Sequence, residues 1–249
     1  MIAAGVLAAS LAALCHETLG HGLGCIGVGG HITLLTSIWF RCQEANWITD
    51  ASGPIASLIG GTATMMFLWY RTPGPIVRLI LLLFGGLSLF WVAGQLIYHP
   101  LINGDDWAFI AREMGWPWLW RPIMGAIGIL TYAALMQWTK AVVRKQGAPG
   151  RHAVQMAYAA SAASAIIAGL MWQPEPVRSA SEGFLTLGIA PIGLLVAAGR
   201  ASADAERISV ATLIPRSWAW IALSIAVFTL FVLVQGRGLG SMAVSGLPR

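Results

Sequence analysis

The chain has 249 residues, of which 57% are hydrophobic and only 10% are charged, and its formal net charge is +5. Soluble domains normally carry about 25% charged residues, so this composition excludes an ordinary soluble protein and predicts an integral membrane protein. The positive charge does not predict nucleic-acid binding, because the basic residues lie in short loops between apolar segments, where membrane proteins commonly carry them.

A membrane-spanning helix needs roughly 20 mostly apolar residues. The sequence contains seven segments of this kind, and they predict an all-α polytopic membrane protein with six or seven transmembrane helices. The first is the least regular, because glycines crowd its second half. The seven candidate segments are residues 2–28, 51–70, 76–98, 121–139, 152–172, 182–199 and 218–235.

Residues 31–40 follow Gly29-Gly30 and are rich in β-branched and aromatic side chains, a composition typical of strands. We therefore predict a short β hairpin near residues 30–45. Backbone of this kind at membrane depth must be buried in protein or line a cavity, so the hairpin is expected to be embedded in the membrane domain.

Basic residues cluster in the loops around residues 71–78 and 140–151. Cytoplasmic loops carry the excess of Lys and Arg, which predicts a cytoplasmic N-terminus. The three cysteines do not indicate a disulfide framework. Cys15 and Cys25 lie within the first apolar segment, and Cys42 follows the predicted hairpin strand.

The sequence His-Glu-Thr-Leu-Gly-His places two histidines and a glutamate in the first apolar segment, where ionisable residues are costly and usually functional. In the zinc motif H-E-x-x-H the histidines are four residues apart, about 40° apart around an α-helix, and both face one metal ion. His16 and His21 are five residues apart, which corresponds to about 140° on a regular helix. A local π-bulge would realign them, and Gly20 favours such a distortion.

Other arrangements of these residues remain open. His21 and Cys25 are four residues apart and share a helical face without any bulge, and His31 lies just beyond them. Alternatively, the histidines are neutral and hydrogen-bonded, with Glu17 paired to one of them. The cost of burying Glu17 without a partner favours metal binding.

A third ligand is expected from the segment Asn-Gly-Asp-Asp-Trp at residues 103–107, which follows the third apolar segment on the same, outer side of the membrane. Two acids after Asn-Gly are also typical of a solvated turn. The sequence does not separate Asp105 from Asp106; we favour Asp106. His99 is a further candidate near the same place.

The order of these features resembles the site-2 protease family of intramembrane zinc metallopeptidases, particularly its small bacterial members. The His-Glu motif is followed by Gly29-Gly30, a strand-like stretch, and Ser52-Gly53-Pro54 at the start of the next span. The resemblance covers about residues 10–70 and, loosely, the Asp near 105. The histidine spacing of five departs from the family's four.

The resemblance implies one zinc ion, bound by His16, His21 and either Asp105 or Asp106. It implies Glu17 as the general base, a transmembrane peptide as the substrate, and the inner membrane of a bacterium as the location. The basic loops instead place the site toward the outer leaflet, whereas the family usually keeps its site nearer the cytoplasm. The chain would then be one integral membrane domain over residues 1–249. Residues 1–110 would form the metal-site core, and residues 111–249 would supply additional transmembrane helices.

Two other functions fit the same residues. One is a non-proteolytic membrane metalloenzyme acting on a lipid or small molecule, since His, Cys and Asp ligands also accept iron or copper. The other is a membrane metal-binding or carrier subunit without catalysis. Transporters usually contain a repeated pair of broken helices, and this sequence shows only one. The partners we expect are membrane lipid, a transmembrane peptide and a further subunit of the same or another chain, and not nucleic acid.

Overall fold

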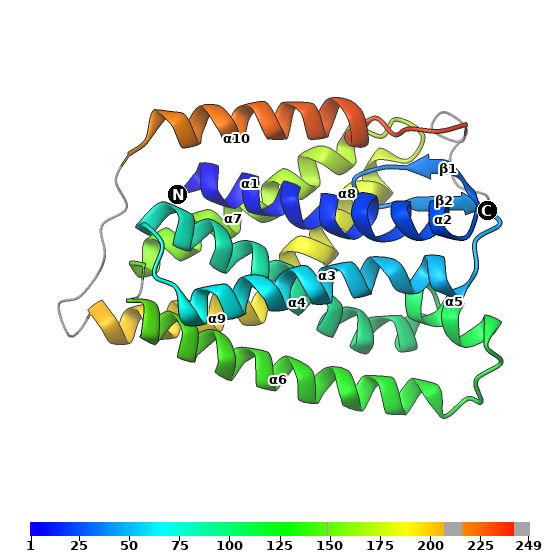
Figure 1. The fold of residues 1–249 in the computed structure, drawn as a ribbon, viewed down its shortest axis with the longest axis horizontal. Coiled ribbons are helices and arrows are strands. Elements are labelled where there is room, and N and C mark those ends of the chain that lie inside the picture. Colours follow the sequence, from blue (N-terminus) through cyan, green and yellow to red (C-terminus); the bar gives the residue numbers. More distant parts are fainter. Residues whose placement is uncertain (148, 207–215, 242–249) are drawn as a thin grey trace.

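The computed structural model describes residues 1–147, 149–206 and 216–241, and its helices lie side by side along one long axis (Figure 1). Three of the helical elements, η1, η2 and η3, are π-helical. In chain order the elements are α1 (Ile2–Ala13), η1 (Leu14–Gly22), α2 (Leu23–Gly27), β1 (His31–Leu35), β2 (Phe40–Gln43), α3 (Trp47–Tyr70), α4 (Pro75–Ile102), α5 (Asp105–Glu113), α6 (Trp120–Gln146), α7 (Arg151–Leu170), α8 (Pro176–Phe184), η2 (Leu185–Ile189), α9 (Ile192–Glu206), α10 (Trp218–Phe231) and η3 (Val232–Gly236).

Seven helical stretches within the described residues are long and apolar enough to cross a membrane, and each overlaps one of the predicted segments. The fourth stretch runs on to Gln146, beyond its predicted end at residue 139. The predicted segment ended at residue 139 because the next residue is Lys140, the first of several basic residues. Basic side chains are favourable in the last turn of a helix, so Arg144 and Lys145 extend α6 instead of ending it.

Helix α4 lies at the centre of the bundle and packs against α1, α3 and α6. Its side chains are buried around most of its circumference, including Leu79, Leu83, Leu87 and Phe90. A helix that is apolar on all sides is expected in the interior of a protein. Polar residues on α4 therefore lie inside the protein and need polar partners there.

The predicted hairpin is present as a two-stranded antiparallel sheet of β1 and β2. The Thr36 hydroxyl closes the turn between the strands by accepting a hydrogen bond of 2.7 Å from the backbone N–H of Trp39. On its other edge, β1 pairs with Leu239 through two backbone hydrogen bonds of 2.9 Å between Leu35 and Leu239.

The two ends of the bundle differ in character. The α3–α4 and α6–α7 connections, which contain the basic loops, lie at the same end as the N-terminus (Figure 1). The hairpin, helix α5 and the α5–α6 connection lie at the opposite end. Helix α5, at this second end, carries Asp105 and Asp106 in its first turn.

Candidate metal centre

The π-helical turn η1 brings His16 and His21 together. Bonding from residue i to i+5 places residues five apart on one face, and the two imidazole centroids are 4.9 Å apart. Both side chains are buried. The helical distortion expected from the sequence is therefore present, and it removes the obstacle that the histidine spacing posed for binding a single ion.

Helix α3 approaches η1 closely because neither helix has a side chain at the crossing point. A Cβ on Gly20 would lie 2.5 Å from the Cα of Gly53, and a Cβ on Gly53 would lie 2.2 Å from Nε2 of His21. The glycine of the Ser52-Gly53-Pro54 segment thus provides the space that the His21 imidazole occupies.

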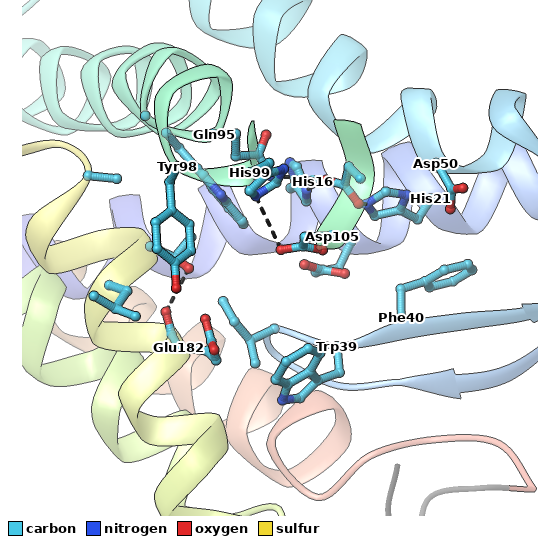
Figure 2. Close-up of a pocket in the computed structure, with 18 of the residues that line it drawn as sticks. His16, His21, Trp39, Phe40, Asp50, Gln95, Tyr98, His99, Asp105 and Glu182 are labelled. Carbon is cyan, nitrogen blue, oxygen red and sulfur yellow. Dashed lines mark hydrogen bonds and ion pairs between the residues drawn. The ribbon is translucent and has the colours of Figure 1, made fainter. Parts of the chain in front are cut away.

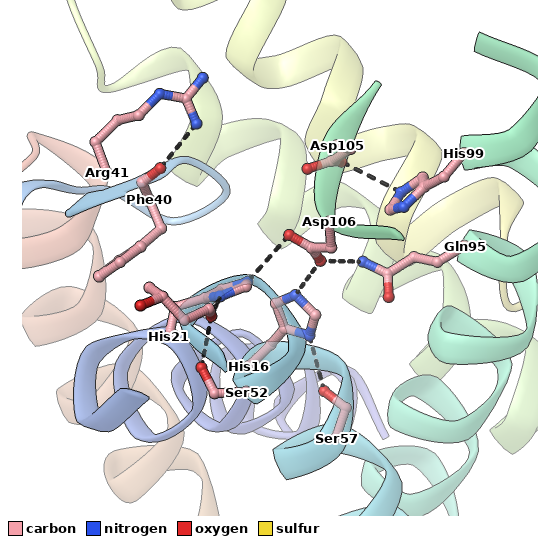
Figure 3. A network of polar contacts seen from close by, with 11 residues as sticks. His16, His21, Phe40, Arg41, Ser52, Ser57, Gln95, His99, Asp105 and Asp106 are labelled. Carbon is pink, nitrogen blue, oxygen red and sulfur yellow. Dashed lines mark hydrogen bonds and ion pairs between the residues drawn. The ribbon is translucent and has the colours of Figure 1, made fainter. Parts of the chain in front are cut away.

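Asp106, in the first turn of α5, completes a buried group with the two histidines (Figure 3). Its Oδ2 atom lies 3.4 Å from Nε2 of His16, and its Oδ1 atom lies 3.4 Å from Nε2 of His21. Burial disfavours its charged form, but the charge of His21 and the contacts with both imidazoles outweigh burial, so the pKa of Asp106 lies well below its usual range.

Neighbouring groups fix the orientation of each ligand side chain. The Nδ1 atom of His21 lies 2.8 Å from the backbone oxygen of Thr49 and must donate to it, because a carbonyl oxygen only accepts. Nδ1 of His16 lies 3.0 Å from the Ser57 hydroxyl. Gln95 donates a hydrogen bond of 3.0 Å from Nε2 to Oδ2 of Asp106. Such partners orient metal ligands and fix the tautomers of histidines.

These contacts make the group suitable for a cation. When Nδ1 of His21 carries the donated proton, a neutral imidazole turns its Nε2 lone pair toward Oδ1 of Asp106. Two lone pairs facing each other repel, so the arrangement needs a proton or a metal ion between them. One ligand atom from each of the three residues lies within 4.8 Å of the other two, which is close enough for all three to reach a single metal ion.

A cavity of about 280 Å³ opens beside this group (Figure 2). Glu17 is buried and lines the cavity, and among the described residues the histidines face Asp106 instead of Glu17. The proposed pairing of Glu17 with a histidine is therefore not observed. The wall also includes Tyr132 and Glu182, so the cavity draws on residues both before and after position 110.

The hairpin covers the candidate metal-ligand group of His16, His21 and Asp106. The Phe40 ring stacks on His21, with centroids 5.3 Å apart and planes 18° apart. Cys25, at the end of the helix that carries the histidines, forms a disulfide with Cys42 of β2. The expectation that the cysteines form no disulfide was wrong, because the hairpin folds back onto the helix and brings Cys42 to Cys25. This bond also removes Cys25 as a metal ligand.

The structure separates the remaining candidate ligands. Asp105, adjacent to Asp106, points to another partner, with its Oδ2 atom 3.3 Å from Nε2 of His99. His31 is exposed at the start of β1 and does not line the cavity. Sequence reasoning missed Gln95, Ser57 and Tyr132, because single polar residues within apolar helices carry no spacing pattern that links them to a distant motif.

No protein-family model, curated protein or solved structure matches the chain.

Proposed function

We propose that this protein is an intramembrane metal-dependent hydrolase, a zinc metallopeptidase similar to those of the site-2 protease family, that cleaves a membrane-embedded peptide. One observation carries the proposal. Two imidazole nitrogens and a carboxylate converge within 4.8 Å of one another, and a buried glutamate lines the cavity beside them. Two histidines and a carboxylate, with a further coordination position open, are the ligand set of several catalytic zinc sites.

The chemistry follows from the positions of the side chains. A zinc ion held by His16, His21 and Asp106 would supply a Lewis acid for water and for the scissile carbonyl. Glu17 takes a proton from the attacking water and delivers it to the leaving amine nitrogen. Trp91 stacks on His16 with centroids 4.0 Å apart, and together with Phe40 it limits the access of bulk water to the ligands.

The hairpin supports a peptide substrate. Leu239 pairs with part of the outer edge of β1, whereas β2 has no second strand partner among the described residues. Phe40 and Arg41 of β2 line the cavity. An extended peptide segment can therefore add to the β2 edge through backbone hydrogen bonds, which would bring it alongside Glu17.

The arrangement of the ends supports a membrane orientation. Basic loops are typical of the cytoplasmic side, and here they lie at the end that holds the N-terminus. Disulfides persist in oxidising compartments such as the bacterial periplasm, and the Cys25–Cys42 bond lies on the hairpin at the other end. We therefore place the N-terminus in the cytoplasm and the metal centre toward the outer leaflet of a bacterial inner membrane.

Peptide cleavage in proteoliposomes tests this function. We would reconstitute the zinc-loaded protein with a panel of fluorogenic single-span peptides and compare it with Glu17→Gln. The variant should retain its metal and lose at least about 100-fold in cleavage rate. Glu113→Gln, at the exposed end of α5, is the matched control and should cleave normally. Cleavage by Glu17→Gln at the wild-type rate would rule out the mechanism.

A further inference from the structure

One face of α4 serves both the metal-ligand group and a second polar pair. Trp91, Gln95 and His99 are spaced four residues apart and so lie in one row along the helix. Trp91 stacks on His16, Gln95 bonds Asp106, and His99 faces Asp105. His99 therefore lies one helical turn, about 6 Å, beyond the residue that holds the third ligand.

His99 directs a hydrogen-bond donor toward the cavity. Its side chain is 3% exposed but lines the cavity wall (Figure 2). Nε2 faces a carboxylate oxygen of Asp105 at 3.3 Å, and a carboxylate only accepts hydrogen bonds. Nε2 must then carry a proton. The other ring nitrogen, Nδ1, is buried without a hydrogen-bond partner. Nε2 is therefore the ring atom that can donate a hydrogen bond to a molecule in the cavity.

Asp105 can orient the Nε2–H group of His99, and it can also give up this hydrogen bond when another acceptor approaches. Its side chain is 46% exposed, so water can replace His99 as its partner when another acceptor approaches. Its backbone is in the left-handed region, with φ of 68°, which is uncommon for residues other than glycine and is enriched at functional sites. The next residue, Asp106, belongs to the metal-ligand group, so the His99–Asp105 pair lies directly beside that group.

We propose that His99 is a second catalytic residue of the hydrolase proposed above, and that Asp105 is its positioning residue; this inference rests on that function. Nε2–H of His99 donates a hydrogen bond to the oxygen of the scissile carbonyl. As the water oxygen bonds to the carbonyl carbon, Glu17 takes a proton from the water and the electron pair of the C=O π bond moves onto the carbonyl oxygen. The hydrogen bond from His99 stabilises the charge on the carbonyl oxygen without transferring a proton. When this electron pair forms the C=O π bond again, the C–N bond breaks, and Glu17 gives its proton to the leaving nitrogen.

A purely structural role would give a different result in a binding experiment. If the His99–Asp105 pair only held α5 against α4, its loss would displace Asp106 and weaken the metal. If His99 acts on the substrate oxygen, its loss leaves the metal in place and weakens an oxygen ligand instead. Cobalt loading with acetohydroxamate as the probe separates the two roles, because both binding steps change the visible spectrum of cobalt.

The experiment compares wild type, His99→Leu and Asp105→Ala, with His31→Leu as the control for an exposed histidine outside the cavity. Leucine removes the N–H donor of the imidazole. We expect His99→Leu to keep its cobalt affinity and to bind acetohydroxamate at least about tenfold more weakly, as for a lost hydrogen bond to a charged group. Asp105→Ala, at the exposed rim, should weaken the probe by a smaller factor, and it keeps the test available if His99→Leu does not fold. His31→Leu should match wild type.

Three outcomes contradict the proposal. Wild-type acetohydroxamate affinity in a cobalt-loaded His99→Leu, or in Asp105→Ala if only that variant folds, would overturn the role of His99 and leave the hydrolase untouched. Loss of cobalt from a folded His99→Leu would assign the pair a structural role. A wild-type protein that binds no cobalt would overturn both the hydrolase and this inference.

Discussion

His16 and His21 face the same carboxylate although five positions separate them in the chain, because the helix between them winds with π geometry. A single extra residue in a helix is accommodated by such a turn, and π-bulges frequently occur at functional sites. The motif is thus equivalent in space to a pair of histidines four residues apart on a regular helix.

Deletion of Leu19 should preserve metal binding. Leu19 is exposed, and its removal sets the histidines four residues apart, the spacing at which an ordinary α-helix aligns them. Insertion of alanine after Leu19 sets them six apart, and neither kind of turn then aligns them, so this variant should lose the metal. Metal stoichiometry on folded protein measures both. A deletion variant that folds but binds no metal would show that the π turn itself is required.

Gly53→Ala should lower metal affinity by about fivefold or more, because the added Cβ overlaps Nε2 of His21 and overpacking of this kind costs about 1–3 kcal/mol. Gly27→Ala is the matched control, since no atom lies within 4 Å of the Cβ it would add. Zinc titration against a competing chelator compares the two. Equal affinities would mean that the imidazole does not need the space at Gly53.

The disulfide predicts one free thiol in the native protein. Cys25 and Cys42 are bonded and Cys15 is free. Maleimide–polyethylene glycol should therefore add once to the unreduced, denatured protein and three times after reduction. Replacing both Cys25 and Cys42 by alanine should lower the free energy of unfolding by about 3 kcal/mol for a loop of this length, whereas Cys15→Ala leaves the bond intact. Three additions without reduction would contradict the pairing.

The orientation predicts opposite labelling at the two ends of the bundle. In a Cys15→Ala background, a cysteine at the exposed position Trp118 should react with a membrane-impermeant maleimide in intact spheroplasts. A cysteine at the exposed position Arg71 should react only after the membrane is permeabilised. The reverse pattern would place the metal centre toward the cytoplasm.

The sequence predicted those parts of the molecule that depend on local composition. Hydropathy located the seven long helices, and the β-branched stretch after Gly29-Gly30 located the hairpin. The requirement that His16 and His21 share one ion predicted the π turn. These features depend on residues that are close together in the chain, so their spacing is visible without coordinates.

Features that depend on contacts between distant segments were not visible. The partnership of Gln95 with Asp106 joins two helices, and no spacing rule connects them. The Cys25–Cys42 bond depends on how the hairpin folds back. Asp105 and Asp106 are chemically equivalent in the sequence, and only the path of the chain into α5 turns one toward the histidines and the other toward His99.

The central claim is that His16, His21 and Asp106 bind one metal ion. Elemental analysis of the purified protein by mass spectrometry, after loading with zinc and removal of free metal, tests it most directly. We expect about one zinc ion per chain in wild type, Asp105→Ala and His31→Ala, and none in His16→Ala, His21→Ala and Asp106→Ala. Wild-type protein without metal, or full occupancy in any of the last three variants when folded, would contradict the claim.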